Sequence, residues 1–404
     1  MLRGTCTRLT ALLHRPLPRP PDAWRRGPFR ADAFRSGLRT ERVAAWLGLW
    51  LGVAFGVCFL TGLISHGIQH PPAWLWWPSR PVDLYRVTQG VHVATGLACV
   101  PLLLAKLWVV YPKLFVWPPA RDVRHAVSRI AVLVLIASAI FQVASGVLNI
   151  ALWYAPMGFF FTVAHFWTAW IAIGALLVHI GAEIEGVRRA VRRPPPAPAA
   201  PSSEDSHGLT RRGLFATVGA AVGVVTVATV GQTLTPLSRL SPLAPRRPDI
   251  GSQGLPVNKS AASAGVEEAA RDPAYRLVVD GPDGQLELSI DDLRSMPAHT
   301  VELPIACVEG WSAEADWTGV RVRDLLDEVG VDPDSDVRIE SLQRGGLFRT
   351  SVLAPPHARD ALTLLAYVLN GETLNLDHGF PCRLIAPNRP GVLQTKWVAR
   401  IGPA

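Results

Sequence analysis

The 404-residue sequence has few cysteines, few lysines and few charges. Its five cysteines form no CxxC or CxxCH pair and no dense cluster, which excludes a disulfide scaffold, a zinc ribbon and covalently attached c-type haem. Only 18% of the residues are charged, whereas 49% are apolar and the mean hydropathy is +0.23. This composition excludes a largely disordered chain. The length is sufficient for two or three domains.

The positive charge is unevenly distributed. The formal net charge is +8, and only four of the 40 basic residues are lysine. Residues 1–269 carry 27 basic and 12 acidic side chains, whereas residues 270–404 carry 13 basic and 20 acidic ones. Because the positive half also holds the apolar runs, this asymmetry indicates the cytoplasmic flank of a membrane protein and not a nucleic-acid partner.

Five apolar runs are long enough to cross a bilayer. Each has roughly 20 residues with few charges, the length that a transmembrane helix needs. Four precede residue 185, and the fifth follows a Pro/Ala/Ser-rich stretch. The predicted spans are 43–65, 88–110, 128–150, 162–182 and 213–234. Buried helices of a large soluble core are the alternative interpretation.

The charges beside these runs predict their orientation. The first 42 residues hold ten arginines and three acidic residues, and basic residues also flank the second-to-third connection and the end of the fourth run. Basic loops stay in the cytoplasm, so we expect a cytoplasmic N-terminus and, after five spans, an extracytoplasmic C-terminal half. Trp74, Trp76 and Trp77 fit an aromatic belt at the outer interface.

A twin arginine precedes the fifth run. Arg211 and Arg212 lie in the stretch TRRGLF, which resembles the signal for export of folded proteins. Ordinary positive-inside charge explains the same residues, and both interpretations stay open.

Four histidines lie in or beside the predicted spans. Ionisable residues within a bilayer are functional candidates. His165 and His179 share one span and are 14 residues apart, about 21 Å along one helix face. We expect His92 and His165 to ligate an outer haem, with His66 as an alternative ligand or as a partner of a quinone or a haem propionate. His179 would ligate an inner haem, for which only His125 is near. Non-ligating histidines are the alternative.

These histidines resemble those of the four-helix di-haem cytochrome b subunits of membrane dehydrogenases and hydrogenases. The resemblance implies one or two b-type haems and exchange of electrons with quinone, quinol or another carrier. In that family the first span carries an inner-face histidine, whereas this sequence has Arg42 and Trp46 at that level.

The C-terminal part has the pattern of a separate α+β domain. Alternating or β-branched runs separated by turn residues predict strands, and the spacing of Leu325, Leu326 and Val329 predicts a helix over 322–329. The strand-like runs are 275–279, 285–290, 301–305, 336–340, 348–353 and 382–386. Turns are expected at 281–284 and 370–371.

Two cysteines lie in this domain. Cys307 follows a strand-like run and precedes the turn residue Gly310, where its thiolate can bind a soft metal. A buried structural cysteine, or a disulfide between Cys307 and Cys382, is the alternative interpretation of these residues.

Several blocks in order resemble the molybdopterin domain of the sulfite oxidase superfamily. They are IACVEGWS, DWTGVRVRDLL, LLAYVLNGETLNLDHGFPCRLIAP and KWV. The resemblance implies that Cys307 ligates molybdenum and is catalytic. It also implies that His378, Gly379, Pro381 and Arg383, with Lys396 and Trp397, contact a molybdopterin cofactor. A guanidinium and an ammonium group are suited to bind its phosphate.

The predicted protein is a multidomain chain in which an all-α transmembrane bundle of four helices plus one anchor helix precedes an α+β domain of the sulfite oxidase type. Its expected parts are a cytoplasmic Arg-rich tail (1–42), a cytochrome b-like membrane domain (43–185), a cytoplasmic linker with the twin arginine (186–212), a fifth transmembrane helix (213–234), an extracytoplasmic linker (235–269) and the molybdopterin domain (270–404).

The expected function is oxygen-atom transfer at an extracytoplasmic molybdenum centre that exchanges electrons with the quinone pool through b-type haem. No convincing counterpart of the substrate-binding arginine cluster of sulfite oxidases is present, since Arg344 and Arg349 are equally well explained as solvated charges. This favours reduction of an S-oxide or N-oxide over oxidation of sulfite. A membrane-anchored module that has lost its metal is the remaining alternative.

Overall fold

The computed structural model describes residues 36–404 except residue 73 and segments 117–121, 193–208, 231–234 and 245–249. Two compact units are found. One comprises the chain up to Phe59 together with Ala94–Thr226, and the other comprises Leu60–Val93 and Val227–Ala404. Most of the predicted N-terminal tail and of the 186–212 linker lies outside the described residues.

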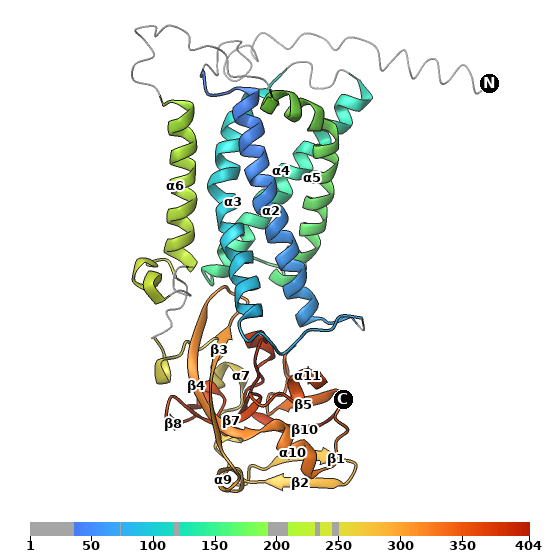
Figure 1. The fold of residues 1–404 in the computed structure, drawn as a ribbon, viewed down its shortest axis with the longest axis vertical. Coiled ribbons are helices and arrows are strands. Elements are labelled where there is room, and N and C mark those ends of the chain that lie inside the picture. The colour runs from blue at the N-terminus through green and yellow to red at the C-terminus, as the bar shows by residue number, and fades with distance from the viewer. Residues whose placement is uncertain (1–35, 73, 117–121, 193–208, 231–234, 245–249) are drawn as a thin grey trace, which may run out of the picture. The chain divides into compact units, whose positions relative to one another are not determined.

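The described residues contain five long apolar helices, as the sequence predicts (Figure 1). They are α2 (Glu41–Gln69), α3 (Leu84–Leu114), α4 (Val123–Ile150), α5 (Phe161–Arg192) and α6 (Arg211–Val230). Most extend beyond the predicted apolar runs, because helical hydrogen bonds continue into the polar flanks, and residues 231–234 of the fifth predicted run lie outside the described residues. Length and composition thus indicate a multi-pass membrane protein.

The apolar surfaces of these helices are consistent with lipid contact. Trp50 is 56% exposed, Leu60 is 62% exposed and Leu104 is 63% exposed. Exposed aliphatic and aromatic side chains of this kind would be costly in water but not in a bilayer.

Within the first unit, α4 and α5 pack along each other (Figure 1), and α6 packs through Leu214 and Val218 against Val43, Leu47 and Val109 of α2 and α3. Lys106, in the second half of α3, donates its Nζ to the carbonyl oxygen of Ala44 at 2.6 Å. This bond gives the ammonium group of an apolar helix a polar partner.

The C-terminal domain contains two five-stranded sheets. The first has the order β2-β1-β10-β5-β6, in which β1 and β10 are parallel and the other pairs are antiparallel. Its strands are β1 (Leu277–Gly281), β2 (Gly284–Leu288), β5 (Val337–Ser341), β6 (Thr350–Leu353) and β10 (Val398–Pro403).

The second sheet has the order β3-β4-β7-β8, with β9 also paired to β7, and is antiparallel throughout. Its strands are β3 (His299–Ala306), β4 (Ser312–Arg321), β7 (Leu364–Leu369), β8 (Glu372–Thr373) and β9 (Arg383–Ile385). The α+β class is therefore confirmed. Strands β4, β7, β8 and β10 were not among the predicted runs.

Short helices precede and connect these strands. They are α7 (Ala261–Ala264), α8 (Glu267–Arg271), α9 (Ile290–Ser295), α10 (Val322–Glu328) and α11 (Pro355–Ala358), with 3-10 turns η4 (Thr235–Leu240), η5 (Ser252–Gly254), η6 (Leu376–His378) and η7 (Gly391–Leu393). Helix α10 confirms the predicted helix, with Leu325 and Leu326 fully buried. At the predicted turn between β7 and β8, Asn370 and Gly371 have φ of 49° and 81°, the left-handed pair that a two-residue hairpin requires.

Strand β7 is covered on both faces. Its residues Leu365 and Tyr367 belong to a core shared with the first sheet, and Leu364 and Ala366 belong to a second core. Alternate side chains of a strand point to opposite faces, so this run is apolar throughout. The second core also contains Cys307.

Candidate functional site

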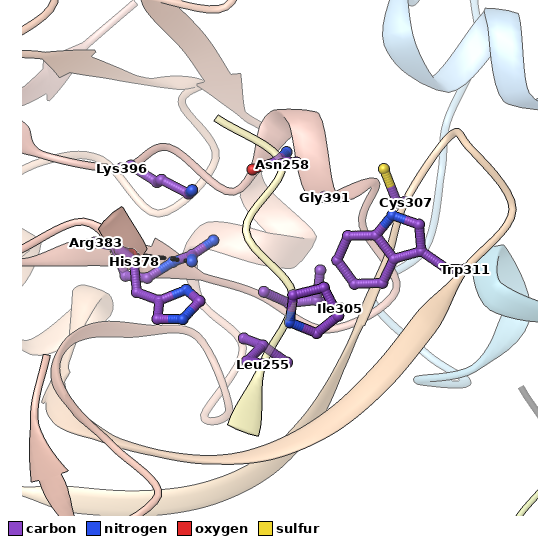
Figure 2. Close-up of a pocket in the computed structure, with 10 residues that line it drawn as sticks. Leu255, Asn258, Ile305, Cys307, Trp311, His378, Arg383, Gly391 and Lys396 are labelled. Carbon is purple, nitrogen blue, oxygen red and sulfur yellow. Dashed lines mark hydrogen bonds between the residues drawn. The ribbon is translucent and has the colours of Figure 1, made fainter. Parts of the chain in front are cut away.

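One pocket brings together the four residues predicted to bind the molybdenum cofactor. Cys307, His378, Arg383 and Lys396 all line it (Figure 2). The rest of the wall consists of Leu255, Pro256, Asn258, Ile305, Trp311 and Gly391. In the view of Figure 2 the segment that carries Leu255 and Asn258 lies between Cys307 and the other three predicted residues. The sequence did not indicate this segment, which falls in the stretch expected to be a linker.

Cys307 lies in a tight turn at the end of β3. The main-chain nitrogen of Cys307 donates to the Trp311 carbonyl at 2.8 Å, and the Gly310 nitrogen donates to the Cys307 carbonyl at 3.1 Å. Gly310 has φ of 91°, a conformation that glycine adopts without strain. The turn holds Cys307 at the pocket wall, and the residue is only 2% exposed.

No disulfide joins Cys307 and Cys382, so that alternative is wrong. The two thiols lie in different cores. The Cys382 sulfur lies 3.2 Å from the hydroxyl of Tyr275, and burial raises the pKa of the Cys382 thiol to about 12. Cys382 is therefore a structural thiol that stays protonated, and it does not line the pocket that Cys307 lines.

His378 is a neutral, oriented imidazole. It is 1% exposed, and its Nε2 lies 2.7 Å from the carbonyl oxygen of Ser252. A carbonyl only accepts, so this bond assigns the proton to Nε2 and makes Nδ1 a hydrogen-bond acceptor. Burial lowers the pKa of His378 to about 4, which keeps the ring neutral at physiological pH.

Arg383 is a buried cation with no ion-pair partner in the described part of the chain. Its Nη1 donates to the His378 carbonyl at 3.0 Å and its Nη2 to the Gln394 carbonyl at 3.3 Å. The guanidinium carbon lies 4.9 Å from the centre of the Trp317 ring. Nε finds no hydrogen-bond partner among the described residues. Burial lowers the pKa of Arg383 to about 9, so it remains charged at neutral pH and its environment favours an anion.

Lys396 adds a second cation at the same pocket. Its Nζ donates to the carbonyl oxygens of Asp377 at 2.7 Å and of Lys259 at 3.0 Å. Gly379 lets the chain segments that carry the two cations pack closely, because a Cβ at this position would lie 3.0 Å from Cβ of Arg383 and 3.2 Å from Cα of Lys396. Gly379 also has φ of 116°.

The donor set fits a molybdopterin cofactor. A thiol at the pocket wall can supply the soft ligand that such a metal prefers. The buried guanidinium with an unused Nε–H and the neighbouring ammonium group suit a phosphate, and Nδ1 of His378 can accept from a pterin N–H group. In the described chain, no group of three or more His, Cys, Asp and Glu side chains has the arrangement of a purely protein-held metal site.

A second buried arginine escaped prediction. Arg389 is 6% exposed, its Nη2 donates to the Val352 carbonyl at 2.6 Å, and its Nη1 has no partner within the described chain. Burial lowers the pKa of Arg389 to about 9, and burial together with the Arg389 charge lowers the pKa of His357 to about 4. Arg344 and Arg349, the two predicted candidates for substrate binding, are exposed. Nothing in the sequence distinguishes Arg389 from these two, because its burial depends on segments distant in the chain.

The predicted haem ligands are divided between the two units. His92 belongs to the second unit and lies against α2, where a Cβ at Gly62 would be 2.8 Å from its Cε1. His66, also in that unit, has its ring centroid 4.8 Å from that of His70.

The other two candidates, on α5, belong to the first unit. Nδ1 of His165 lies 3.1 Å from Oγ of Ser145 on α4, and Nδ1 of His179 is buried without a hydrogen-bond partner among the described residues. The pairing of His92 with His165 stays a prediction.

Comparisons with known proteins point to the same cofactor as the donor set of the pocket. Residues 264–403 match the family described as the oxidoreductase molybdopterin binding domain. Mitochondrial sulfite oxidase of Mus musculus is 35% identical over 155 residues, which cover 31% of this chain and 28% of that protein. The uncharacterized oxidoreductase YuiH of Bacillus subtilis (strain 168) is 32% identical over 120 residues, which cover 30% of this chain and 59% of that protein.

A solved structure, the sulfane dehydrogenase SoxCD from Paracoccus pantotrophus, aligns with 25% identity over 32% of this chain and 38% of that chain, with a TM-score of 0.30. The matched region thus spans less than two thirds of each of these proteins. Residues 264–403 form a molybdopterin-binding oxidoreductase domain of the sulfite oxidase family.

Proposed function

We propose that the chain is a membrane-bound molybdopterin-dependent oxidoreductase that transfers an oxygen atom at an extracytoplasmic molybdenum centre. It exchanges electrons with the quinone pool through b-type haem in its membrane helices. The observation that carries the proposal is the convergence of Cys307, His378, Arg383 and Lys396 on one pocket.

Each of these residues has a distinct role in the proposal. The bound cofactor supplies two-electron oxygen-atom transfer. Cys307 presents its sulfur as the protein ligand of the metal, Arg383 and Lys396 neutralise the cofactor phosphate, and Nδ1 of His378 accepts a hydrogen bond from the pterin. Because Cys307, His378 and Arg383 are each at most 2% exposed, the pocket excludes bulk water and strengthens these interactions.

The environment of the helix histidines supports haem binding. A haem-ligating histidine coordinates through one ring nitrogen and usually donates from the other, as His165 can do toward Ser145. The glycines next to His92 and His165, Gly62 and Gly146, leave the rings free of larger neighbours on that side. The buried Nδ1 of His179 needs a partner, and coordination of the iron of a second haem would supply one.

The placement of basic residues supports an extracytoplasmic catalytic domain. The Arg-rich N-terminal region and the basic end of α5 would stay in the cytoplasm. Arg211 and Arg212 form the start of α6, where a twin-arginine signal for export of the folded, cofactor-loaded domain would lie.

Reduction of an S-oxide or N-oxide is the favoured direction, because the predicted arginines Arg344 and Arg349 are exposed and do not form an anion site at the pocket. Oxidation of sulfite is the second candidate. It is supported by relatives named sulfite oxidase and by the buried guanidinium of Arg389, which has an unused donor.

Metal analysis and haem spectroscopy on the purified full chain test the proposal. We expect about one molybdenum per chain, a b-type haem spectrum, and reoxidation of dithionite-reduced haem by methionine sulfoxide. Haem reduction by sulfite would instead select the dehydrogenase. Cys307→Ser should abolish turnover, whereas Cys382→Ser, which alters a buried thiol of the same domain, should retain it. Full metal loading and turnover in Cys307→Ser would refute the assignment, and absence of molybdenum after co-expression with the cofactor machinery would favour a module without metal.

A further inference from the structure

The turn that carries Cys307 also contacts the start of the long apolar helix α3. The second unit includes Leu60–Val93, which contains the end of α2 and the start of α3, together with the C-terminal domain. The start of α3 therefore belongs to the same compact unit as the pocket that Cys307 lines.

Gln89 of α3 bonds directly to the turn. Its Nε2 donates to the carbonyl oxygen of Val308 at 2.8 Å, and Val308 is the residue after Cys307. Gln89 is 5% exposed, and its Oε1 has no partner among the described residues. Because Gln89 is buried, its bond to Val308 is shielded from water, and loss of the bond would leave a buried carbonyl oxygen without this donor.

One helical turn further on, Val93 packs against the glycine of the same turn. A Cβ at Gly310 would lie 2.7 Å from Cγ2 of Val93. Gly310 therefore has two constraints, its φ of 91° and the close approach of α3. The hydrogen bond from Gln89 and the packing of Val93 both hold the segment between Cys307 and Gly310. Both contacts come from α3 and not from the sheets of the C-terminal domain.

The two sides of the turn are held by the same helix. On one side, Arg86 donates to Oγ of Ser312 at 2.9 Å and to Oε1 of Glu314 at 2.6 Å. On the other side, the Tyr85 nitrogen donates to Oδ1 of Asn388 at 2.6 Å, and Tyr85 is 1% exposed, packed on Ala306.

A metal–thiolate bond needs a fixed direction for the sulfur, and residues around a ligand usually supply it. Two short main-chain hydrogen bonds close the turn, and the contacts from α3 add to them. We propose that the first three turns of α3 position the Cys307 turn, with Gln89 as the main positioning residue. The geometry of the metal ligand is thereby set in part by a membrane helix. The inference rests on the proposed function of Cys307.

Gln89→Glu in the full chain tests this inference at a pH that keeps the new carboxyl group ionised, because it keeps the shape of the side chain, removes the donor and places carboxylate oxygens toward the Val308 carbonyl. The matched control is Gln69→Glu. Gln69 donates within α2, to the carbonyl oxygen and Oγ of Ser65 at 3.1 and 3.2 Å. Val93→Ala is a milder second variant that only trims the packing on Gly310.

The first measurement uses the cofactor-free full chain. The alkylation rate of Cys307 by iodoacetamide, followed peptide by peptide in mass spectrometry, reports opening of the turn. We expect about a tenfold faster rate in Gln89→Glu, the factor that corresponds to one lost buried hydrogen bond. Val93→Ala should give a smaller increase, and Gln69→Glu none.

The second measurement uses the loaded protein. The electron paramagnetic resonance spectrum of Mo(V) reports the orientation of the thiolate, and we expect altered g-values in Gln89→Glu but not in Gln69→Glu. Unchanged alkylation rates and spectra in both Gln89→Glu and Val93→Ala would overturn the inference. If Cys307→Ser leaves the spectrum unchanged, the proposed function fails instead, so the two failures are distinguishable.

Discussion

Replacement of Gly379 by alanine should disrupt the cation pair of the pocket. Gly379 has φ of 116° and ψ of 20°, a conformation that costs a residue with a side chain about 1–3 kcal/mol. The new Cβ would lie 3.0–3.2 Å from Cβ of Arg383 and from Cβ and Cα of Lys396, and overpacking of this kind costs about 1–3 kcal/mol. The total destabilisation expected from these two costs is therefore about 2–6 kcal/mol.

Gly265→Ala is the matched control for this change. Gly265 has φ of 65°, but no atom lies within 4 Å of the position that a Cβ would take there, so only the conformational cost of about 1–2 kcal/mol applies. Thermal unfolding followed by tryptophan fluorescence should show a larger loss of Tm for Gly379→Ala, at roughly 3 °C per kcal/mol.

The cofactor content of the two variants separates an effect on the pocket from a general loss of stability. Because the alanine pushes Arg383 and Lys396 apart, the molybdopterin retained per folded chain should fall in Gly379→Ala and stay normal in Gly265→Ala. Equal losses of Tm in the two variants, with unchanged molybdopterin content, would refute the reasoning that Gly379 brings the cations together.

Three further changes have expected outcomes. Arg383→Met should reduce molybdopterin content at least about tenfold. The Tm of the cofactor-free chain should stay unchanged or rise, because the change removes a buried charge that has no ion-pair partner among the described residues. A lowered Tm would contradict this. The folded-state pKa of His378 is lowered to about 4. The unfolded chain therefore binds more protons than the folded chain between about pH 6.5 and pH 4. Folding stability is lost as the pH falls through that range. His378→Gln should flatten this part of the curve of Tm against pH, and an unchanged curve would exclude His378 as its source. Gly62→Val should displace the ring of His92 and weaken the haem spectrum. Gly52→Ala should leave the spectrum unchanged, because no atom lies within 4 Å of the added Cβ. Equal spectra of the two variants would count against His92 as a haem ligand.

The parts of the fold that depend on local interactions were predictable. Each long helix forms its hydrogen bonds within one segment, so a run of apolar residues is enough to predict α2 to α6. The same is true of helix α10 and of the hairpin at Asn370 and Gly371. Strands β4, β7, β8 and β10 were missed, because β7 is buried on both faces and shows no alternation, and β10 reaches its parallel partner β1 from the far end of the domain.

The sequence by itself determined the class of the domain, the cysteine proposed to bind the metal and the cations of the cofactor blocks, since these are carried by residue types in short, ordered motifs. Only the tertiary structure decided that Cys382 lies in a different core from Cys307, that Arg389 is buried while Arg344 is exposed, and that Gln89 of the long apolar helix α3 bonds to the turn after Cys307. Each of these facts depends on contacts between segments far apart in the chain. Burial and pairing are therefore set by packing, which no local pattern of residues encodes.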